Sequence, residues 1–521
     1  MIKPQALWMF AAVVVVTATL TLNRLPIQFG DGPFYASIAK SLQSGSAGVP
    51  SVLGPGPTSV DHVRFYGPVF FSALAAWFSV VGLSSLTFRL FCLASALLVA
   101  FGGLAVSWSL GGRAHRQAWS FLILLLSPEL GAAATFGRMD AFAVGFEMFA
   151  LALFVHGLLH QRRPYLHGIA SGAVLAGAAL STPRTFPFIL GFVVAVVAVL
   201  GRRERVKRHT TIQLAACVGT ATVLWLVWTI FSAGGPMKWL WMMFFIATHE
   251  TTDVALLGTP RQWIFSPWQL ITPAFSIAGA FLLAPRLRGH ATHVVAAKFS
   301  LAVTWVTFVV TWTLFSYTFL FGTYAILPLL AVVLAVPLPM TEINRRRVAT
   351  VGLALMIAFA GLRAVKLIRG GVTWSARDPD RLTAFVRQHV PAGSVVIGRD
   401  QDYFFNVEES GSRYLTASQI SASDWARWIP AIDGYEAPPL KQPHGDFLLW
   451  PDAADAPIPD ALRQCATLQR VAAYTPPPLD LPALEWLTRG DARAGYPATT
   501  LYRMSSPEAP APAPHSTCAT R

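Results

Sequence analysis

The chain has 521 residues, of which 54% are hydrophobic and only 13% are charged, and its formal net charge is +14. Soluble domains carry about 25% charged residues, so this composition argues against a soluble enzyme, a disordered protein and a nucleic-acid-binding protein. It is typical of a protein that crosses a membrane several times.

The charge is distributed unevenly along the chain. Residues 1–369 contain 27 Lys and Arg against 9 Asp and Glu, whereas residues 370–521 contain 13 against 17. We therefore predict a transmembrane domain over residues 1–369, an extracytoplasmic α/β domain over 370–504, and a disordered Pro/Ala/Ser-rich tail over 505–521. The excess of basic residues belongs to the membrane part, where the positive-inside rule explains it without nucleic acid.

Apolar runs that predict helices follow one another through the membrane part. They lie at about 6–22, 67–82, 86–108, 117–136, 141–158, 166–181, 186–200, 211–233, 268–284, 297–316, 324–338 and 348–368. A spanning helix needs about 20 apolar residues, with about 17 as the lower end. The first run follows Lys3 and has no convincing cleavage site, so we interpret it as a retained signal anchor.

The loops between these runs predict the orientation in the membrane. Fourteen Lys and Arg are concentrated in five loops of 45 residues in all, namely 111–117, 159–165, 201–210, 285–296 and 339–347. If all five loops lie in the cytoplasm, the run at 67–82 does not cross, and we predict that it forms a helix in the outer leaflet. The predicted fold class is then a membrane all-α bundle of about eleven transmembrane helices plus a C-terminal extracytoplasmic α/β domain. Twelve spans with one exception to the charge rule is the alternative.

A short polar stretch after the first run leads into an amphipathic segment that begins at Asp31. Apolar residues at positions 34, 38, 39 and 42 predict a helix that can lie on the membrane. Asp31 then stands at or just before the N-terminus of this helix. On composition alone, a helix-capping role and a functional role are both open for it.

Acidic side chains are scarce in the membrane part, so each of them is informative. Those at or beyond the predicted outer face are Asp31, Asp61, Asp140, Glu250 and Asp253, and those within spans are Glu129 and Glu147. An ionisable group within a span is costly and is a functional candidate by default. Pairing with polar groups inside the bundle is equally open for the last two. Asp140 and Glu147 are seven residues apart and therefore share one helix face.

The region after residue 369 has the pattern of a small α/β domain. Helical spacing predicts a helix over Asp380–Val390 and a short one over Asp460–Cys465. Strands are predicted over 394–398, 447–450, 468–474 and 499–504. Cys465 and Cys518 form a disulfide only if this region faces an oxidising compartment and folds them together, and the sequence leaves that pairing open.

The order of motifs over residues 1–160 resembles a known family. Asp31-x-x-x-Tyr35 follows the first span, Tyr66-Gly67-Pro68-Val69 opens an apolar helix, and Gly137-Arg138-Met139-Asp140 follows two further spans. This order is similar to that of the C-type membrane glycosyltransferases, in the branch of protein O-mannosyltransferases and lipid A aminoarabinose transferases. The resemblance weakens after residue 160 and extends to about residue 370.

The resemblance implies a polyprenyl-phosphate-sugar donor, bound in the outer leaflet, and inverting transfer to an acceptor. Asp31 matches the catalytic aspartate of the family, and Asp140, together with Arg138, matches the second acidic position. Many members have Asp-Glu where this chain has Asp31-Gly32, and Lys-Pro-Pro-Leu where it has Tyr66-Gly67-Pro68-Val69. The phosphate-binding lysine is therefore missing, and a nearby base such as Arg64 has to substitute for it.

Elementary chemistry defines the groups that such a transfer needs. A hydroxyl that attacks an anomeric carbon needs a base within about 3 Å, and a carboxylate at the membrane surface can serve. A phosphate leaving group needs cationic stabilisation rather than a strong general acid. The candidates for binding the donor phosphate are Arg64, Tyr66, Arg138, Arg184, His249 and Arg261, although lipid headgroup contact is an alternative for each cation. Tyr35 and Glu147 are predicted to contact the acceptor or to be structural.

The pattern therefore predicts a glycosyltransferase of the bacterial inner membrane, with membrane lipid and an envelope glycan, lipid or protein acceptor as partners. We expect no cofactor and no metal. Asp378-Pro379-Asp380 and Asp400-Gln401-Asp402 have the form used for nucleotide sugars, but they lie in the outer domain, where such donors are absent. No zinc-type spacing or phosphate-binding loop occurs. The rival hypotheses are a lipid-linked sugar flippase or other secondary transporter, and a non-catalytic envelope-assembly protein.

Overall fold

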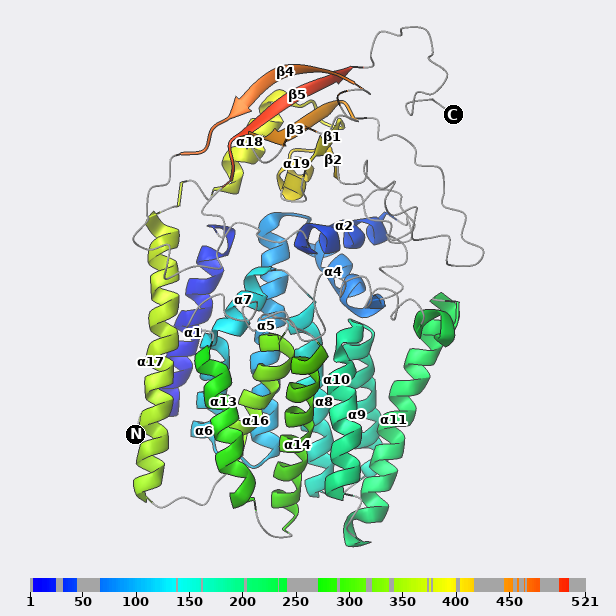
Figure 1. The fold of residues 1–521 in the computed structure, drawn as a ribbon, viewed down its shortest axis with the longest axis vertical. Helices are drawn as coiled ribbons and strands as arrows, with labels where there is room; N and C mark the ends of the chain where they lie inside the picture. Colours follow the sequence, from blue (N-terminus) through cyan, green and yellow to red (C-terminus); the bar gives the residue numbers. More distant parts are fainter. Residues whose placement is uncertain are drawn as a thin grey trace.

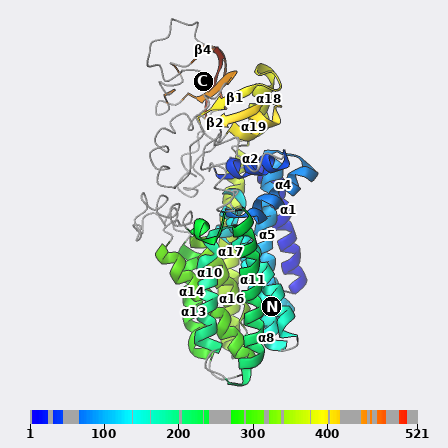
Figure 2. The ribbon, with the colours of Figure 1, turned by 90° about the vertical axis from the view of Figure 1, so that its right-hand side faces the viewer.

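The structure is a computed structural model, in which a body of long helices carries a small sheet domain at one end (Figure 1). It describes residues 3–24, 31–44, 66–136, 139–160, 163–200, 204–232, 234–240, 270–287, 291–314, 321–336, 342–372, 374–375, 378–399, 403–416, 445–452, 457–458, 463, 466–477 and 496–505. We call the end of the body that carries the sheet the domain end. Figure 2 shows the same two parts from the side.

Each of the eleven apolar runs predicted to span the membrane forms a helix or a bent helix pair. The helices are α1 (Pro4–Thr21), α5 (Ser85–Ser109), α6 (Ala114–Leu126), α7 (Pro128–Phe136), α8 (Asp140–His160), α9 (Pro164–Ala179), α10 (Phe186–Ala195), α11 (Glu204–Ser232), α13 (Ile271–Leu283), α14 (Thr292–Leu314), α16 (Leu327–Ala335) and α17 (Glu342–Val372). Among the described residues, five helices are individually long and apolar enough to cross a membrane, and α6 and α7, which are bent by 60° relative to each other, are so when taken together. The bend falls at Pro128, which cannot continue the hydrogen bonding of α6.

Shorter helical turns connect these helices. They are η1 (Leu22–Arg24), η2 (Pro183–Thr185), η3 (Val196–Leu200), η6 (Ala284–Arg286) and η7 (Phe321–Ile326), of which η3 and η7 are π-helical. Exposed apolar side chains cover the outer helices, such as Val13 on α1, Val223 on α11 and Ile357 on α17. Such a surface is suited to lipid, where non-polar side chains cost nothing to expose.

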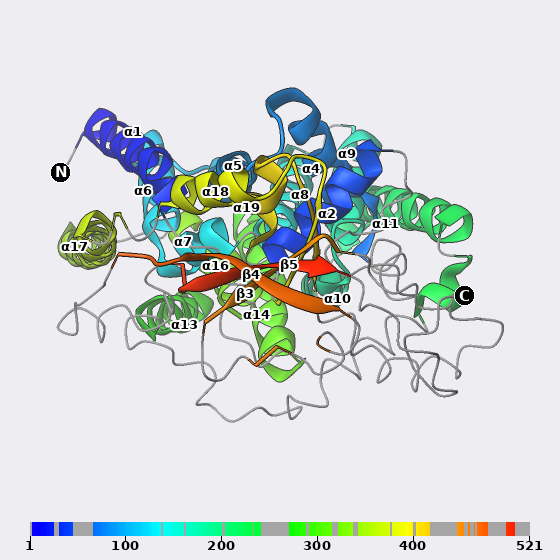
Figure 3. The ribbon, with the colours of Figure 1, turned by 90° about the horizontal axis from the view of Figure 1, so that it is seen from above.

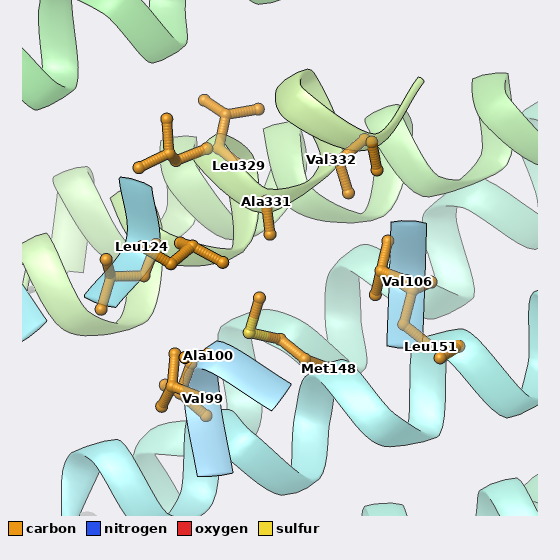
Figure 4. Packing of buried hydrophobic residues seen from close by; sticks show 14 of the residues in the cluster. Val99, Ala100, Val106, Leu124, Met148, Leu151, Leu329, Ala331 and Val332 are labelled. Atoms are coloured by element: carbon orange, nitrogen blue, oxygen red, sulfur yellow. The ribbon is translucent and has the colours of Figure 1, made fainter. Parts of the chain in front are cut away.

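Small residues bring the central helices close together. A Cβ on Gly145 of α8 would lie 2.7 Å from the Leu98 side chain of α5, and one on Gly102 of α5 would lie 2.8 Å from Met148. Close approach through small residues is typical of helices packed in a membrane. Figure 4 shows the resulting core, in which α5, α6, α8 and α16 interdigitate around Met148.

Two further helices lie at the domain end: α2 (Asp31–Gln43) and α4 (Pro68–Val81) (Figure 1). The first confirms the predicted helix that begins at Asp31. It is more enclosed than a helix resting on a membrane surface, because residues 32–39 are all buried. The reason is that α4 covers one side of it and the sheet domain covers another. The run at 67–82 forms α4, which packs mainly against α2 and also contacts α5 and α8 through Phe70.

The C-terminal region forms a mixed five-stranded sheet with two helices. Its elements are α18 (Pro379–His389), β1 (Val395–Gly398), α19 (Phe404–Glu409), β2 (Arg413–Thr416), β3 (Phe447–Pro451), β4 (Thr467–Tyr474) and β5 (Thr499–Ser505). The strand order is β2-β1-β3-β5-β4. The pairs β1–β2 and β1–β3 are parallel, whereas β3–β5 and β4–β5 are antiparallel. The predicted helix at Asp380 and the four predicted strands are confirmed.

The sequence analysis missed two elements here, α19 and β2. The short helix predicted over Asp460–Cys465 lies outside the described residues except for Arg463, and so do both Cys465 and Cys518. The division into residues 1–369, 370–504 and 505–521 stays a prediction. The tail beyond Ser505 is outside the described residues.

The sheet domain and the domain end of the helical body share one hydrophobic core. Buried residues of α2, α4 and the start of α5 pack in the same cluster as buried residues of α18, α19 and β1. Figure 3 looks down on this junction and shows α18 and α19 above α2 and α5. The sheet domain is therefore packed directly onto the helical body through apolar contacts.

Candidate active site

Buried polar side chains gather at the domain end of the helical body. They come from α2, the start of α4, the first turn of α8, η2 and η7, which are far apart in the sequence. Polar groups enclosed among apolar helices are costly unless they are paired or functional. This cluster is therefore the candidate site.

Asp140 and Arg184 form its centre. Asp140 is the first residue of α8 and is fully buried, while the side chain of Arg184 is 12% exposed. Arg184 Nη1 lies 3.8 Å from Asp140 Oδ1, which is an ion-pair distance but too long for a hydrogen bond. The Thr182 hydroxyl accepts the Arg184 N–H at 3.3 Å and so caps η2. The ion pair with Asp140 therefore keeps the guanidinium at the centre of the cluster.

The Tyr66 ring also lies next to Arg184. The Arg184 Cζ lies 5.8 Å from the centroid of the Tyr66 ring, within cation–π range. Tyr66 is followed by Gly67 with φ of +87°, where a Cβ would lie 2.3 Å from the Leu180 carbonyl oxygen. Only glycine fits this approach of α4 to the end of α9, and the Val69 N–H then donates to Leu180 O at 3.1 Å. The Tyr-Gly-Pro motif therefore places the tyrosine ring over the cation.

Tyr35 extends the cluster into α2. Its ring lies 6.3 Å from that of Tyr66 in an edge-on arrangement, and its side chain is 1% exposed. It also packs edge-on against Phe70 and Phe71 of α4. The aromatic contacts thus join α2 to the start of α4 beside the Asp140–Arg184 pair.

Tyr324 approaches the same pair from η7. Its side chain interacts with Asp140 and lies within electrostatic reach of Arg184 and Glu147. It is 2% exposed and sits on a π-helical turn, a distortion that is frequent at functional sites. Reasoning from the sequence missed this residue. A single tyrosine at the start of an apolar run was the signal available, and it did not distinguish a core residue from a site residue.

Glu147 lies two turns beyond Asp140 on α8, about 10 Å along the helix axis. It is fully buried, interacts with Thr185, and feels the charge of Asp140. Among the described residues, neither of its carboxylate oxygens has a hydrogen bond of normal geometry. The predicted shared face of Asp140 and Glu147 is thus the face that meets η2 and η7.

Glu129, the other acidic residue predicted within a span, lies in the first turn of α7. It is 7% exposed and interacts with the Thr272 side chain of α13. A Cβ on Gly322 of η7 would lie 2.5 Å from its Cγ, so η7 packs directly against it. Glu129 is therefore in contact with the element that carries Tyr324.

The structure brings together five of the predicted site residues: Asp140, Arg184, Tyr66, Tyr35 and Glu147. Asp31 is the first residue of α2, but its side chain lies outside the described set. The positions of Arg64, Arg138, His249 and Arg261 also lie outside the described residues. Arg184 is the basic residue that the described part of the chain places beside Asp140.

Acidic residues of the sheet domain have local structural partners. Asp378 caps α18, because its Oδ1 accepts the Asp380 N–H at 3.2 Å. Within the described ranges, no three His, Cys, Asp or Glu side chains are grouped so that they could hold a metal ion. The expectation of metal independence stays a prediction.

The fold and this buried site define a class: a multi-span helical membrane protein with a mixed-sheet domain over a polar cluster. No family model matches the chain, and no curated protein matches it in sequence.

Among solved structures, the chain matches the crystal structure of ArnT from Cupriavidus metallidurans bound to undecaprenyl phosphate. The TM-score is 0.56 at 14% identity, with 96% of this chain and 98% of that chain covered. The apo structure of the same protein aligns with a TM-score of 0.45 at 13% identity, over 95% and 97% of the two chains, and supports no further argument. The chain therefore has an ArnT-like fold, which confirms the predicted fold class of a helical membrane body with a C-terminal α/β domain.

Proposed function

We propose that this protein is an inverting glycosyltransferase that moves a sugar from a polyprenyl-phosphate donor to an envelope glycan, lipid or protein. The observation that carries the proposal is the buried Asp140–Arg184 pair, flanked by two tyrosines, at the domain end of an ArnT-like fold. The relative with this fold was crystallised with undecaprenyl phosphate, which is the lipid part of such a donor.

Arg184 is the group that we assign to the donor phosphate. Its guanidinium is pre-positioned by Asp140 and the Tyr66 ring, and it offers several N–H donors in one plane. Negative charge grows on the phosphate as its bond to the sugar breaks, and a fixed cation in an enclosed site stabilises that charge strongly. Arg184 thus supplies what the missing lysine supplies in the family. Arg64, Arg138, His249 and Arg261 remain additional candidates.

Asp31 is the base in this proposal. It removes the proton from the acceptor hydroxyl while the hydroxyl oxygen attacks the anomeric carbon. The bond between that carbon and the phosphate oxygen breaks, and the electron pair leaves with the polyprenyl phosphate. The configuration at the anomeric carbon is inverted, because attack and departure occur on opposite faces. Asp140 orients the base or the acceptor, and its charge is balanced by Arg184.

A phosphate acceptor makes a weaker demand on Asp31. Its oxygen is already ionised, so no proton has to be removed. The charge rule supports an outer-face location for the site. Helix α5 begins at the junction and α8 begins at Asp140, so Arg113 and Arg163, which come after the far ends of these helices, lie on the opposite side of the body from the site.

The test is a transfer assay with purified protein in nanodiscs, radiolabelled polyprenyl-phosphate sugars and membrane extract as acceptor. Wild type is compared with Asp31→Asn, and half the samples contain EDTA. We expect label in a new product with wild type, with and without EDTA, and a loss of about 10²–10⁴-fold in the variant for a hydroxyl acceptor. Full activity of a folded Asp31→Asn protein contradicts the base assignment. Movement of donor across the bilayer without a new glycosidic bond favours the flippase instead.

A further inference from the structure

Helix α19 of the sheet domain reaches the helical body through two consecutive carboxylates. The Glu408 carboxylate forms an ion pair and hydrogen bond with Lys40 Nζ of α2. The next residue, Glu409, accepts the N–H of Ser85, the first residue of α5, at 2.6 Å. One six-residue helix therefore contacts two helices of the body whose sequences lie more than 300 positions away.

Glu408 is held from both sides. Its side chain is 3% exposed, against 42% for Lys40, and its Oε1 also accepts the Tyr414 N–H of β2 at 3.1 Å. A buried carboxylate with a cationic partner and a backbone donor is costly to leave half-paired. Glu408 therefore links the sheet edge to α2 through one side chain.

Glu409 acts on the start of α5. The first N–H groups of a helix have no partner within it, and a carboxylate there also meets the positive end of the helix dipole. Ser84 and Thr87 form a reciprocal capping box at the same end, with hydrogen bonds of 3.0 and 2.8 Å. Glu409 adds a partner for the next free N–H, from a different part of the chain.

Apolar contacts surround these bonds. The Phe405 ring of α19 lies 5.4 Å from the Phe88 ring of α5, and both side chains are buried. Within the domain, Asn406 Nδ2 donates to Pro379 O at 3.0 Å and to Thr383 Oγ1 at 3.1 Å. Helix α19 is therefore fixed to α18 on one side and to the helical body on the other.

The helix that α19 holds is the one that carries Asp31. Lys40 lies nine residues after Asp31, about 14 Å along α2. At its far end α2 is tied to α4, because Gln43 Nε2 donates to Ala75 O at 2.9 Å. Between Asp31 and Lys40, Tyr35 contacts the Tyr66 ring that lies next to Arg184. A tilt or roll of α2 thus moves Asp31 and Tyr35 relative to the Asp140–Arg184 pair.

We propose that α19 is a positioning element for the transfer reaction, and that Glu408, through Lys40, sets the orientation of α2 and hence the place of Asp31 against the donor. The sheet domain then contributes to the geometry of the active site by orienting α2. This inference rests on the proposed function for its catalytic consequence. The contact between α19 and α2 does not depend on it.

The test is a charge-reversal cycle in full-length protein in nanodiscs, with Lys40→Glu, Glu408→Lys and the double variant. Glu408→Gln is a milder fourth variant in case charge reversal prevents folding. Arg470→Glu is the matched control, because Arg470 is an exposed cation on β4, away from the junction. Two quantities are measured: amide hydrogen exchange across α2, and the kcat and donor KM of sugar transfer.

We expect each single variant to speed exchange in α2 and to lower kcat by about 10- to 100-fold, the effect of a misplaced reacting group. Donor KM should change by less than about threefold, because phosphate binding by Arg184 is untouched. The double variant restores an ion pair of opposite polarity and should recover most of both quantities, while the control behaves like wild type.

Three outcomes would overturn the inference. The first is a double variant no better than the single ones although all are folded. The second is unchanged α2 exchange in Glu408→Lys and Glu408→Gln, and the third is an unchanged kcat although α2 loosens. A wild-type protein that transfers no sugar overturns the proposed function instead. The exchange measurement then still decides whether α19 holds α2.

Discussion

Carboxylates are buried in two regions of this molecule, and the two regions differ in the hydrogen-bond partners that they give them. In the helical body, Asp140 faces Arg184 at 3.8 Å and Glu147 has no hydrogen bond of normal geometry to a described residue. At the junction with the sheet domain, Glu408 has both a lysine and a backbone N–H, and Glu409 has a backbone N–H at 2.6 Å. Buried polar groups that are fully paired stabilise a structure, whereas loosely paired ones lower its stability and persist where function needs them.

This difference indicates a functional role for the carboxylates of the body and a structural role for those of the junction. In the body, the buried carboxylate of Glu147 has no hydrogen bond of normal geometry to a described residue, and an ionisable group left in this way within a span is a functional candidate. At the junction, Glu408 and Glu409 accept hydrogen bonds from other elements of the same chain, as a fixed support requires. The comparison predicts that changes in the body act on transfer first, and that changes at the junction act on helix position and stability first.

The largest effect is expected at Arg184. Arg184→Gln removes the described cation beside Asp140, so transfer should fall by about 10²–10³-fold, measured as kcat/KM for the donor. Arg184→Lys keeps a charge but loses the planar set of donors, and should retain part of the activity. Near-normal transfer by Arg184→Gln would show that another cation binds the phosphate. It would also contradict the expectation that changes in the body act on transfer first.

Tyr324→Phe is expected to have the next largest effect. It removes a hydroxyl that interacts with Asp140 but leaves the ring to fill its place on η7. The hydroxyl has no hydrogen bond of normal geometry to a described residue, so it acts on Asp140 through electrostatics, and kcat/KM should fall by about 10-fold with little change in Tm. Tyr502→Phe, a change of the same kind on β5 of the sheet domain, is the control. Equal activity of wild type and Tyr324→Phe would place Tyr324 in the core rather than in the site.

Glu147→Gln tests whether the buried carboxylate of Glu147 contributes to transfer. A charge about 10 Å from the Asp140–Arg184 pair acts on it with about 1–2 kcal/mol, so transfer should fall by up to about tenfold. Tm should not fall, because the neutral amide avoids the cost of a buried charge. A lower Tm with full activity would instead give Glu147 a structural role and make it resemble the junction carboxylates.

The smallest effect is the pH dependence that Glu409 gives the junction. Burial raises the pKa of Glu409, the Ser85 N–H lowers it, Asp380 raises it and Arg387 lowers it, with a net increase. The folded state therefore binds this proton more tightly than the unfolded state. The resulting stability is present below about pH 4.3, the ordinary value for glutamate, and is lost as pH rises through the higher folded value.

Glu409→Gln should flatten this dependence while its amide oxygen still accepts the Ser85 N–H. The measurement is Tm across this acidic range for wild type and variant. A wild-type Tm that rises with pH where the variant does not would contradict the assigned sign.

Much of the fold was predictable, because hydropathy and charge act locally. The eleven apolar runs, the helix beginning at Asp31, the helix at Asp380 and four strands of the sheet all follow from patterns within one short segment each. The motif order also predicted the fold that the ArnT structure confirms. Helix α19 was missed because Phe-Phe-Asn-Val-Glu-Glu is too short to show a helical period, and its two phenylalanines resemble a strand.

The acidic residues of the candidate site could be predicted from the sequence, but the side chains that contact them were harder to predict. Asp140 and Glu147 stand out because charges are rare in apolar runs, and Tyr66 belonged to a motif. Tyr324 does not stand out, because an isolated tyrosine in an apolar run is compatible with a core position. Its role depends on which helix η7 packs against.

By itself, the sequence determined that the chain crosses a membrane, which of its loops are basic and which segment begins at Asp31, since each depends on side chains that are neighbours in the chain. Only the tertiary structure decided that Arg184 faces Asp140, that Tyr324 reaches the same pair, and that Glu408 holds Lys40 from 368 positions away. Such contacts depend on how whole helices pack, and packing is settled by the sum of many weak contacts rather than by any one local pattern.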